Sequence, residues 1–198
     1  MNRIELLQFS LGAAFDVLGQ VVADLTQEQA DWLPPGRAVP IGALYWHAVG
    51  YSDQLVHLHC MAPFRSVRQQ ELQEAMRAKQ DLGMGQVPLR HSAGWQEKVV
   101  LALPPENPED PFWDLRAVRG GLKVDLPALH EYAQATAQAI QGALAALTPK
   151  DLERTISTSV GDYAMDHFLA FFIIWHINAH CGEISAIKGC QGLQGYPW

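Results

Sequence analysis

Residues 168–184 read FLAFFIIWHINAHCGEI, an uninterrupted run of eight apolar residues followed by two histidines four positions apart. The flanks predict one helix from about Ala164 to Lys188, because Gly189 and Gly192 follow it as helix-ending residues. The apolar run is far shorter than the roughly 20 residues that cross a bilayer. It therefore indicates a helix buried in a protein core, with two imidazoles inside it.

His176 and His180 lie one above the other on such a helix, with roughly 6 Å between their Cβ atoms. That spacing suits two ligands to one metal ion, although two independently packed histidines would show the same pattern. The surroundings favour the metal, because an unpaired imidazole in so apolar a helix is costly to desolvate. Glu183 shares their face and is a candidate to orient a ligand imidazole or to accept a proton.

A third imidazole stands in a similar context. The sequence predicts a second helix from Pro40, in the first position, to about Met61, with His47 at the centre of its apolar face. A bundle that places this helix beside the last one supplies three nitrogens to one ion. Tyr51 and Gln54 share the face of His47, so we expect them to line a substrate pocket.

Two further helices complete the pattern. Apolar residues recur at spacings of three and four from Ile4 to Leu25, and a second periodic stretch runs from Leu126 to Leu147. The 64–123 connection is rich in proline and glycine, with a polar helix predicted over Gln69–Lys79, and residues 155–163 predict a loop or an extended piece. The prediction is an all-α four-helix bundle with a long, partly irregular connection between helices 2 and 3, in a single domain over residues 1–198.

Composition narrows the function. The chain has 14 Lys and Arg against 21 Asp and Glu, a net charge of −7, without a basic cluster, which argues against a nucleic-acid partner. No signal peptide or membrane span is predicted. Three cysteines without a C-x-x-C pair favour a reduced, cytoplasmic protein. A zincin peptidase is excluded, because Ile177 and Ala179 stand where the two zincin types require glutamate.

The remaining candidates are weaker. Cys181 lies roughly 140° from the face of His176, and no base is placed to activate it. The other five histidines are expected to be surface or partly buried structural residues; these are His57, His59, His91, His130 and His167.

Taken together, these residues resemble the DinB/YfiT-like family of metalloenzymes over essentially the full length. The motifs that carry the resemblance are Leu25-Thr26-x-x-Gln29-x-x-Trp32-x-Pro34, Pro40-Ile-Gly-Ala-Leu-Tyr-Trp-His47, Gly94-Trp95-x-x-Lys98 and, most specifically, His176-x-x-x-His180-x-Gly182-Glu183-Ile184. The resemblance implies a four-helix bundle with one metal ion held by His47, His176 and His180. It also implies a homodimer and a divalent ion such as nickel or zinc.

Some members of that family use low-molecular-weight thiols in transferase or isomerase reactions. We therefore expect a divalent-metal-dependent enzyme acting on a small molecule, of the thiol-dependent S-transferase, isomerase or hydrolase type. Three neutral imidazoles leave coordination positions open, as catalytic sites do. The alternative is a non-catalytic module that binds a small ligand or serves a stress response through the same site.

Overall fold

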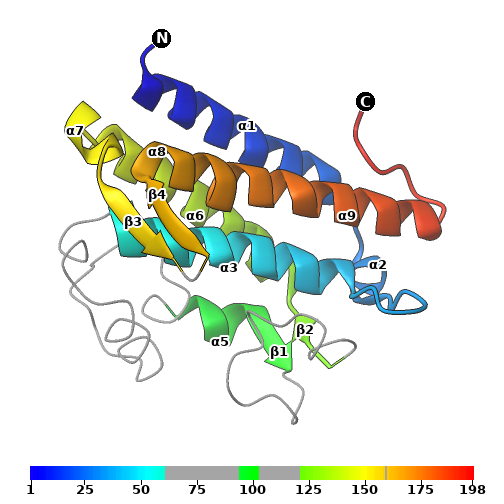
Figure 1. The fold of residues 1–198 in the computed structure, drawn as a ribbon. Coiled ribbons are helices and arrows are strands. Elements are labelled where there is room, and N and C mark those ends of the chain that lie inside the picture. The colour runs from blue at the N-terminus through cyan, green and yellow to red at the C-terminus, as the bar shows by residue number, and fades with distance from the viewer. Residues whose placement is uncertain (61–93, 103–120, 159) are drawn as a thin grey trace.

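Four long helices pack side by side in the computed structural model, which describes residues 1–60, 94–102, 121–158 and 160–198 (Figure 1). The first three are α1 (Arg3–Val22), α3 (Ile41–Cys60) and α6 (Leu126–Ala145). The fourth runs without a break through α8 (Met165–Phe168), η2 (Leu169–Trp175) and α9 (His176–Cys190). The predicted all-α bundle is confirmed. Most of the connection between α3 and α6, including the helix predicted over Gln69–Lys79, lies outside the described residues.

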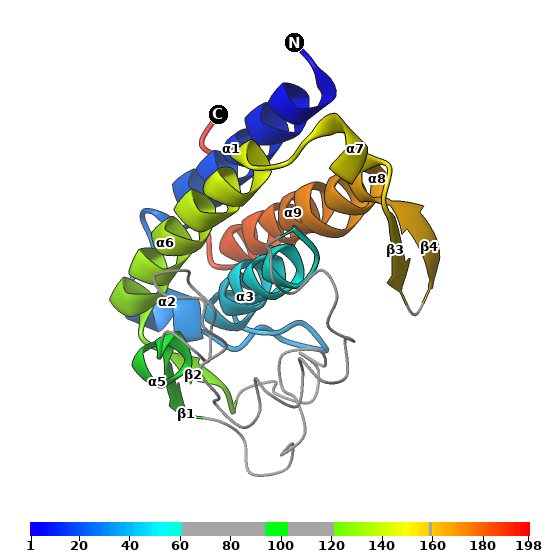
Figure 2. The ribbon, with the colours of Figure 1, turned by 90° about the vertical axis from the view of Figure 1, so that its left-hand side faces the viewer.

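The helices form a ring in which each packs on two neighbours. α3 lies against α6 and α9, and α1 lies against the same two helices from the other side (Figure 2). The predicted stripe of α1 is buried in this core, from Leu7 through Val21. Within the described part, α1 is long and apolar enough to cross a membrane by length and composition alone, a test that a buried core helix also passes. The ring brings α3 and α9 face to face, which sets the relation between His47 and the last helix.

Short elements close the ends of the bundle. α2 (Gln27–Asp31) begins at a capping box formed by Thr26 and Gln29, and α7 (Pro149–Leu152) begins at one formed by Thr148 and Asp151. A further turn, α5 (Trp95–Val99), leads into β1 (Val100–Ala102), which pairs with β2 (Lys123–Val124). The described parts of the connection between α3 and α6 therefore form regular elements next to the bundle.

Residues 155–164 form an antiparallel hairpin. β3 (Thr155–Thr158) pairs with β4 (Gly161–Ala164). The sequence predicts either a loop or an extended piece here, and the structure has the extended one. The hairpin precedes α8 directly and projects from that end of the bundle (Figure 1).

The last helix departs from a regular α-helix. Residues Leu169–Trp175 form π-helical turns, in which each hydrogen-bonded ring spans one more residue than in an α-helix. An uninterrupted α-helix was expected there, because no glycine, proline or capping residue marks the change. Such segments are frequent next to functional sites, and this one ends where His176 begins.

The start of α3 is fixed by close contact with its surroundings. A side chain at Gly42 would lie 2.8 Å from Val124 and 3.3 Å from the carbonyl oxygen of Ala30, so only glycine fits without a shift. Gln27 of α2 links that helix to β2 and to the start of α6, since its amide donates to the Val124 carbonyl at 2.8 Å and its oxygen accepts from Leu126 at 3.0 Å. These contacts set the position of α3, and with it the position of His47 one and a half turns further on.

Candidate metal centre

Three imidazoles meet at the interface of α3 and α9. The Nε2 atom of His176 lies 3.1 Å from Nε2 of His47 and 3.1 Å from Nε2 of His180. His47 is 7% exposed, and the other two are half-buried. The structure therefore brings together the three histidines that the sequence analysis selected, with one ring nitrogen of each directed at the others.

Hydrogen bonding alone does not explain this cluster. Nε2 of His176 faces two ring nitrogens but carries at most one proton or one lone pair, so it cannot serve both contacts well. Its other nitrogen, Nδ1, is buried without a hydrogen-bond partner in the described structure. Burial, followed by the nearby His180 and His47, lowers the pKa of His176 to about 2, so this ring is neutral at physiological pH.

A divalent cation fits the three nitrogens. Two nitrogens bound at about 2.05 Å to one tetrahedral ion are roughly 3.3 Å apart, close to the 3.1 Å separations here. Neutral imidazole is a common ligand of zinc, nickel and similar ions. The donor set therefore matches such an ion in chemistry, the two contacts of His176 match it in spacing, and all three ligand nitrogens lie within 4.8 Å of one another.

Glu183 orients the ring of His180 through a hydrogen bond. Its Oε2 lies 2.6 Å from Nδ1 of His180, and this hydrogen bond is the main cause that lowers the pKa of the Glu183 carboxyl. A carboxylate can only accept, so Nδ1 carries the ring proton and Nε2 keeps its lone pair for an ion. Carboxylate support of this kind is typical of metal-binding histidines.

Tyr51 and Gln54 occupy different positions relative to the cluster. The Tyr51 ring stacks on His176 with centroids 4.1 Å apart and planes at 20°, and burial raises the pKa of its hydroxyl. Gln54 is 4% exposed, and its Oε1 has no hydrogen-bond partner among the described residues. Tyr51 thus covers one side of the cluster, while the role of both residues as substrate contacts stays a prediction.

A pocket of about 360 Å³ opens on the other side of the cluster, next to His180. Its described lining consists of Arg37, Ala38, Val39, Leu44, His180, Glu183, Ala186 and Ile187. Neither Tyr51 nor Gln54 belongs to this lining. The sequence analysis did not predict this pocket, because residues 37–39 lie in a loop whose path periodicity does not reveal.

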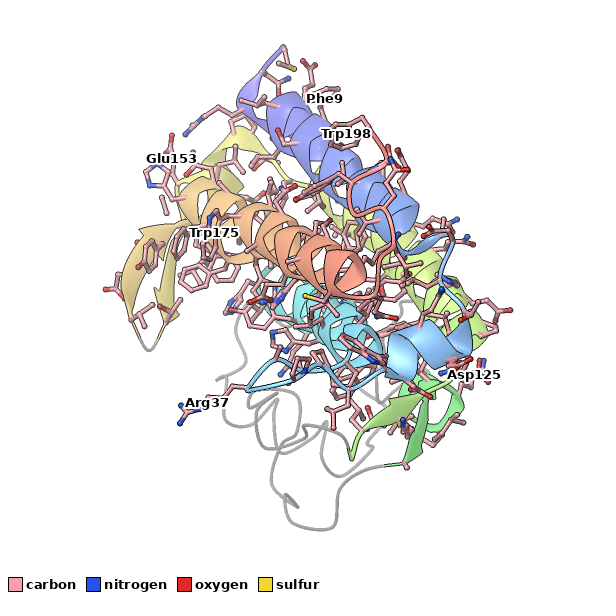
Figure 3. All side chains as sticks on the ribbon, turned by 90° about the vertical axis from the view of Figure 1, so that its right-hand side faces the viewer. Phe9, Arg37, Asp125, Glu153, Trp175 and Trp198 are labelled. Atoms are coloured by element: carbon pink, nitrogen blue, oxygen red, sulfur yellow. The ribbon has the colours of Figure 1, made fainter. Side chains whose placement is uncertain are left out.

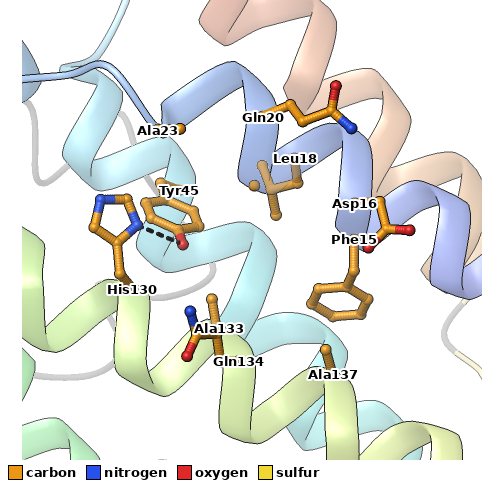
Figure 4. Close-up of a pocket in the computed structure, with 11 residues that line it drawn as sticks. Phe15, Asp16, Leu18, Gln20, Ala23, Tyr45, His130, Ala133, Gln134 and Ala137 are labelled. Atoms are coloured by element: carbon orange, nitrogen blue, oxygen red, sulfur yellow. Dashed lines mark hydrogen bonds between the residues drawn. The ribbon is translucent and has the colours of Figure 1, made fainter.

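A larger pocket, of about 650 Å³, lies between α1 and α6 with Tyr45 of α3 at its base (Figure 4). Figure 4 shows the Tyr45 hydroxyl directed at Nδ1 of His130, 3.2 Å away. Phe15 and Leu18 supply apolar surface from α1. None of the three clustered histidines lines it, so it is separate from the candidate metal centre.

The sequence analysis missed a buried polar network centred on Asp53, the residue before Gln54. Nδ1 of His57 hydrogen-bonds to the main-chain carbonyl of Asp53 at 2.6 Å and lies 2.7 Å from its carboxylate, which accepts from the Tyr132 hydroxyl at 2.6 Å. His57 is 1% exposed, so it is buried in the core rather than at the surface or partly buried as expected. The i, i+4 spacing of Asp53 and His57 is the one signal in the sequence that could have indicated the pair.

The Gly94-Trp95-x-x-Lys98 motif packs on this network. Trp95 stacks on Tyr132 with ring centroids 5.4 Å apart, and the Lys98 ammonium lies 4.6 Å from the Trp95 ring centre. Gly94 begins the turn with a φ of 71°, in the left-handed region that favours glycine. The motif therefore anchors the connection to α6.

The cysteines are not placed as nucleophiles. Cys181 is buried, and that burial raises the pKa of its thiol to about 12, so it stays protonated. Cys60 is also buried, and its thiol contacts the sulfur of Met165. Cys190 is exposed near the end of α9.

The fold and the histidine cluster together define a helical-bundle protein with a candidate site for a divalent metal ion. The family model of the DinB superfamily matches residues 11–184, and the chain belongs to that superfamily.

Comparison with solved structures agrees on the fold. The chain is similar to a crystal structure described as the conserved protein of locus from Enterococcus faecalis, with a TM-score of 0.64 and 19% sequence identity. The match covers 95% of this chain and 96% of that chain. None of the curated protein sequences matches this chain.

Proposed function

We propose that this protein binds one divalent metal ion, nickel or zinc, through His47, His176 and His180, and acts as a metal-dependent enzyme on a small molecule. The reaction class that we propose is thiol-dependent S-transfer, isomerisation or hydrolysis, with a low-molecular-weight thiol as co-substrate for the first two. The observation that carries the proposal is the pair of 3.1 Å contacts among three Nε2 atoms, which a cation satisfies and hydrogen bonds do not.

The chain's own residues prepare the site. A bound divalent ion supplies Lewis-acid chemistry at coordination positions that three imidazoles leave open. Glu183 holds the proton on Nδ1 of His180, and because its side chain is 56% exposed we also propose it as an acceptor of a proton from the substrate. Tyr51 fixes the ring plane of His176 by stacking. The buried surroundings of His47 keep bulk water from that side of the cluster.

Metal analysis of single variants tests the ligand set. We expect about one equivalent of metal per chain in the purified protein, and a sharp loss of it in His47→Ala, His176→Ala and His180→Ala. His167→Ala is the matched control, because His167 is exposed and outside the cluster. Equal metal content in the triple variant contradicts the proposal.

We also propose that the protein is a cytoplasmic homodimer that binds neither nucleic acid nor membrane. Support for pairing comes from large aromatic side chains left exposed on the face of α1 and the last helix, where Phe9 is 69% and Trp175 57% exposed (Figure 3). Light scattering of the protein and of a Phe9→Ser, Trp175→Ser double variant tests it. A monomer mass for the unaltered chain at micromolar concentration contradicts it.

A further inference from the structure

The pocket beside His180 extends from the histidine cluster in one direction only. Leu44 precedes His47 by about one turn of α3, and Ile187 follows His180 by about two turns of α9, yet both line the same pocket. Tyr51 lies one turn beyond His47 on the opposite side, where it stacks on His176. The cluster is thus covered on the Tyr51 side and adjoins the pocket on the Leu44 side.

The walls of the pocket are mainly apolar. Val39, Leu44 and Ile187 present well-buried side chains that are 4–7% exposed. Ala38 and Ala186 add small apolar groups at its more exposed part. The polar lining residues are His180 and Glu183, which bond to each other, and Arg37 on an exposed loop. A ligand therefore meets polar groups beside the cluster and apolar surface beyond it.

The volume sets the size of the ligand. A pocket of about 360 Å³ corresponds to about twelve water volumes at roughly 30 Å³ each, or a body of roughly ten non-hydrogen atoms. This is near the lower end of the range for small-molecule sites.

We propose that this pocket, between α9 and residues 37–44, binds the apolar body of the substrate, a molecule of roughly ten non-hydrogen atoms whose polar group reaches the histidine cluster. The inference rests on the proposed function, because the polar group is the one presented to the metal. Ala186 then determines specificity, since it is the exposed, small residue on the α9 wall where added bulk would narrow the pocket.

A series of linear hydroxamates measures separately how the polar head and the apolar tail of such a ligand contribute to binding. The head group binds a metal ion, and the tail reports on the pocket. The probes are acetohydroxamate, butanohydroxamate, hexanohydroxamate and octanohydroxamate, titrated into zinc-loaded protein by calorimetry. We expect affinity to rise by about fourfold for each buried methylene up to the hexanoyl member and then to level off as the pocket fills.

Variants at Ala186 test the same point without altering a histidine. Ala186→Phe should weaken hexanohydroxamate by about tenfold or more while leaving acetohydroxamate within about twofold, and Ala186→Leu should fall between. The matched control is Ala145→Phe, an exposed position on α6 outside the pocket. Zinc content measured for each variant shows that the centre itself is intact.

The outcomes distinguish this inference from the proposed function. Affinities that are independent of tail length, with acetohydroxamate bound, overturn the pocket proposal alone, as does an Ala186→Phe variant that binds hexanohydroxamate like the unaltered protein. Failure to load zinc contradicts the metal centre, and failure of acetohydroxamate to bind the loaded protein contradicts its open coordination positions; either result also overturns the pocket proposal. Tail-dependent affinity that Ala186→Phe removes supports the pocket proposal.

Discussion

Glu183→Ala tests how the protein prepares the proposed metal site. Its carboxylate accepts a 2.6 Å hydrogen bond from Nδ1 of His180, and its side chain is 56% exposed. Loss of a carboxylate that supports a metal-binding histidine typically weakens metal binding by about 10- to 100-fold. Because solvent screens about half of this side chain, we expect Glu183→Ala to weaken metal binding by about tenfold, the lower end of that range, or about 1.4 kcal/mol.

A second substitution separates charge from geometry. In Glu183→Gln the amide oxygen can still accept from Nδ1, so His180 keeps its orientation and only the charge is lost. We expect zinc affinity between those of the unaltered protein and Glu183→Ala, measured by competition with a chromophoric chelator. Glu131→Gln, exposed on α6, is the control. Unchanged affinity in folded Glu183→Ala would refute the argument that this carboxylate orients the ligand.

Three further predictions concern stability and reactivity. Lys188→Met should lower the free energy of unfolding by about 1–3 kcal/mol, measured in urea, because the buried ammonium donates to the Val21 carbonyl at 2.8 Å. Iodoacetamide should label the exposed Cys190 and spare Cys181 in the native protein, as read by mass spectrometry. Metal-free protein should lose stability as the pH falls below about 6.5, because His176 becomes protonated in the unfolded chain but stays neutral in the folded chain, where its pKa is about 2. Binding of this one proton to the unfolded chain lowers the free energy of unfolding by about 2 kcal/mol at pH 5. His176→Gln should remove that part of the pH dependence.

The long helices were predictable because their signals are local. The apolar stripe of α1 is a pattern within a few residues, and the structure has it where the sequence predicts it. The π-helical turns were not predictable, because the run from Leu169 to Trp175 is apolar on every face and gives no phase information. The pairing of residues 155–164 depends on contacts between two short strands that composition does not specify.

The candidate site likewise has one part that the sequence predicts and one part that it does not. His176, His180 and Glu183 share one helix, so their spacing alone places them on one face. His47 needed the additional assumption that α3 lies beside the last helix, which the bundle architecture provides. The pocket next to His180 depends on a loop that reaches the site from outside the helices, and no periodic pattern encodes such an approach.

The π-helical turns before His176 also bear on how the sequence can change in length. Adding or removing one residue in an α-helix rotates everything beyond it by about 100°. A helix that already contains wider turns can lose a residue there by tightening to α-helical geometry, with both ends still facing the core. Length variation among relatives should therefore concentrate in Leu169–Trp175, whereas His176–Glu183 should keep its length if these residues form the proposed site, because their common face depends on fixed spacing.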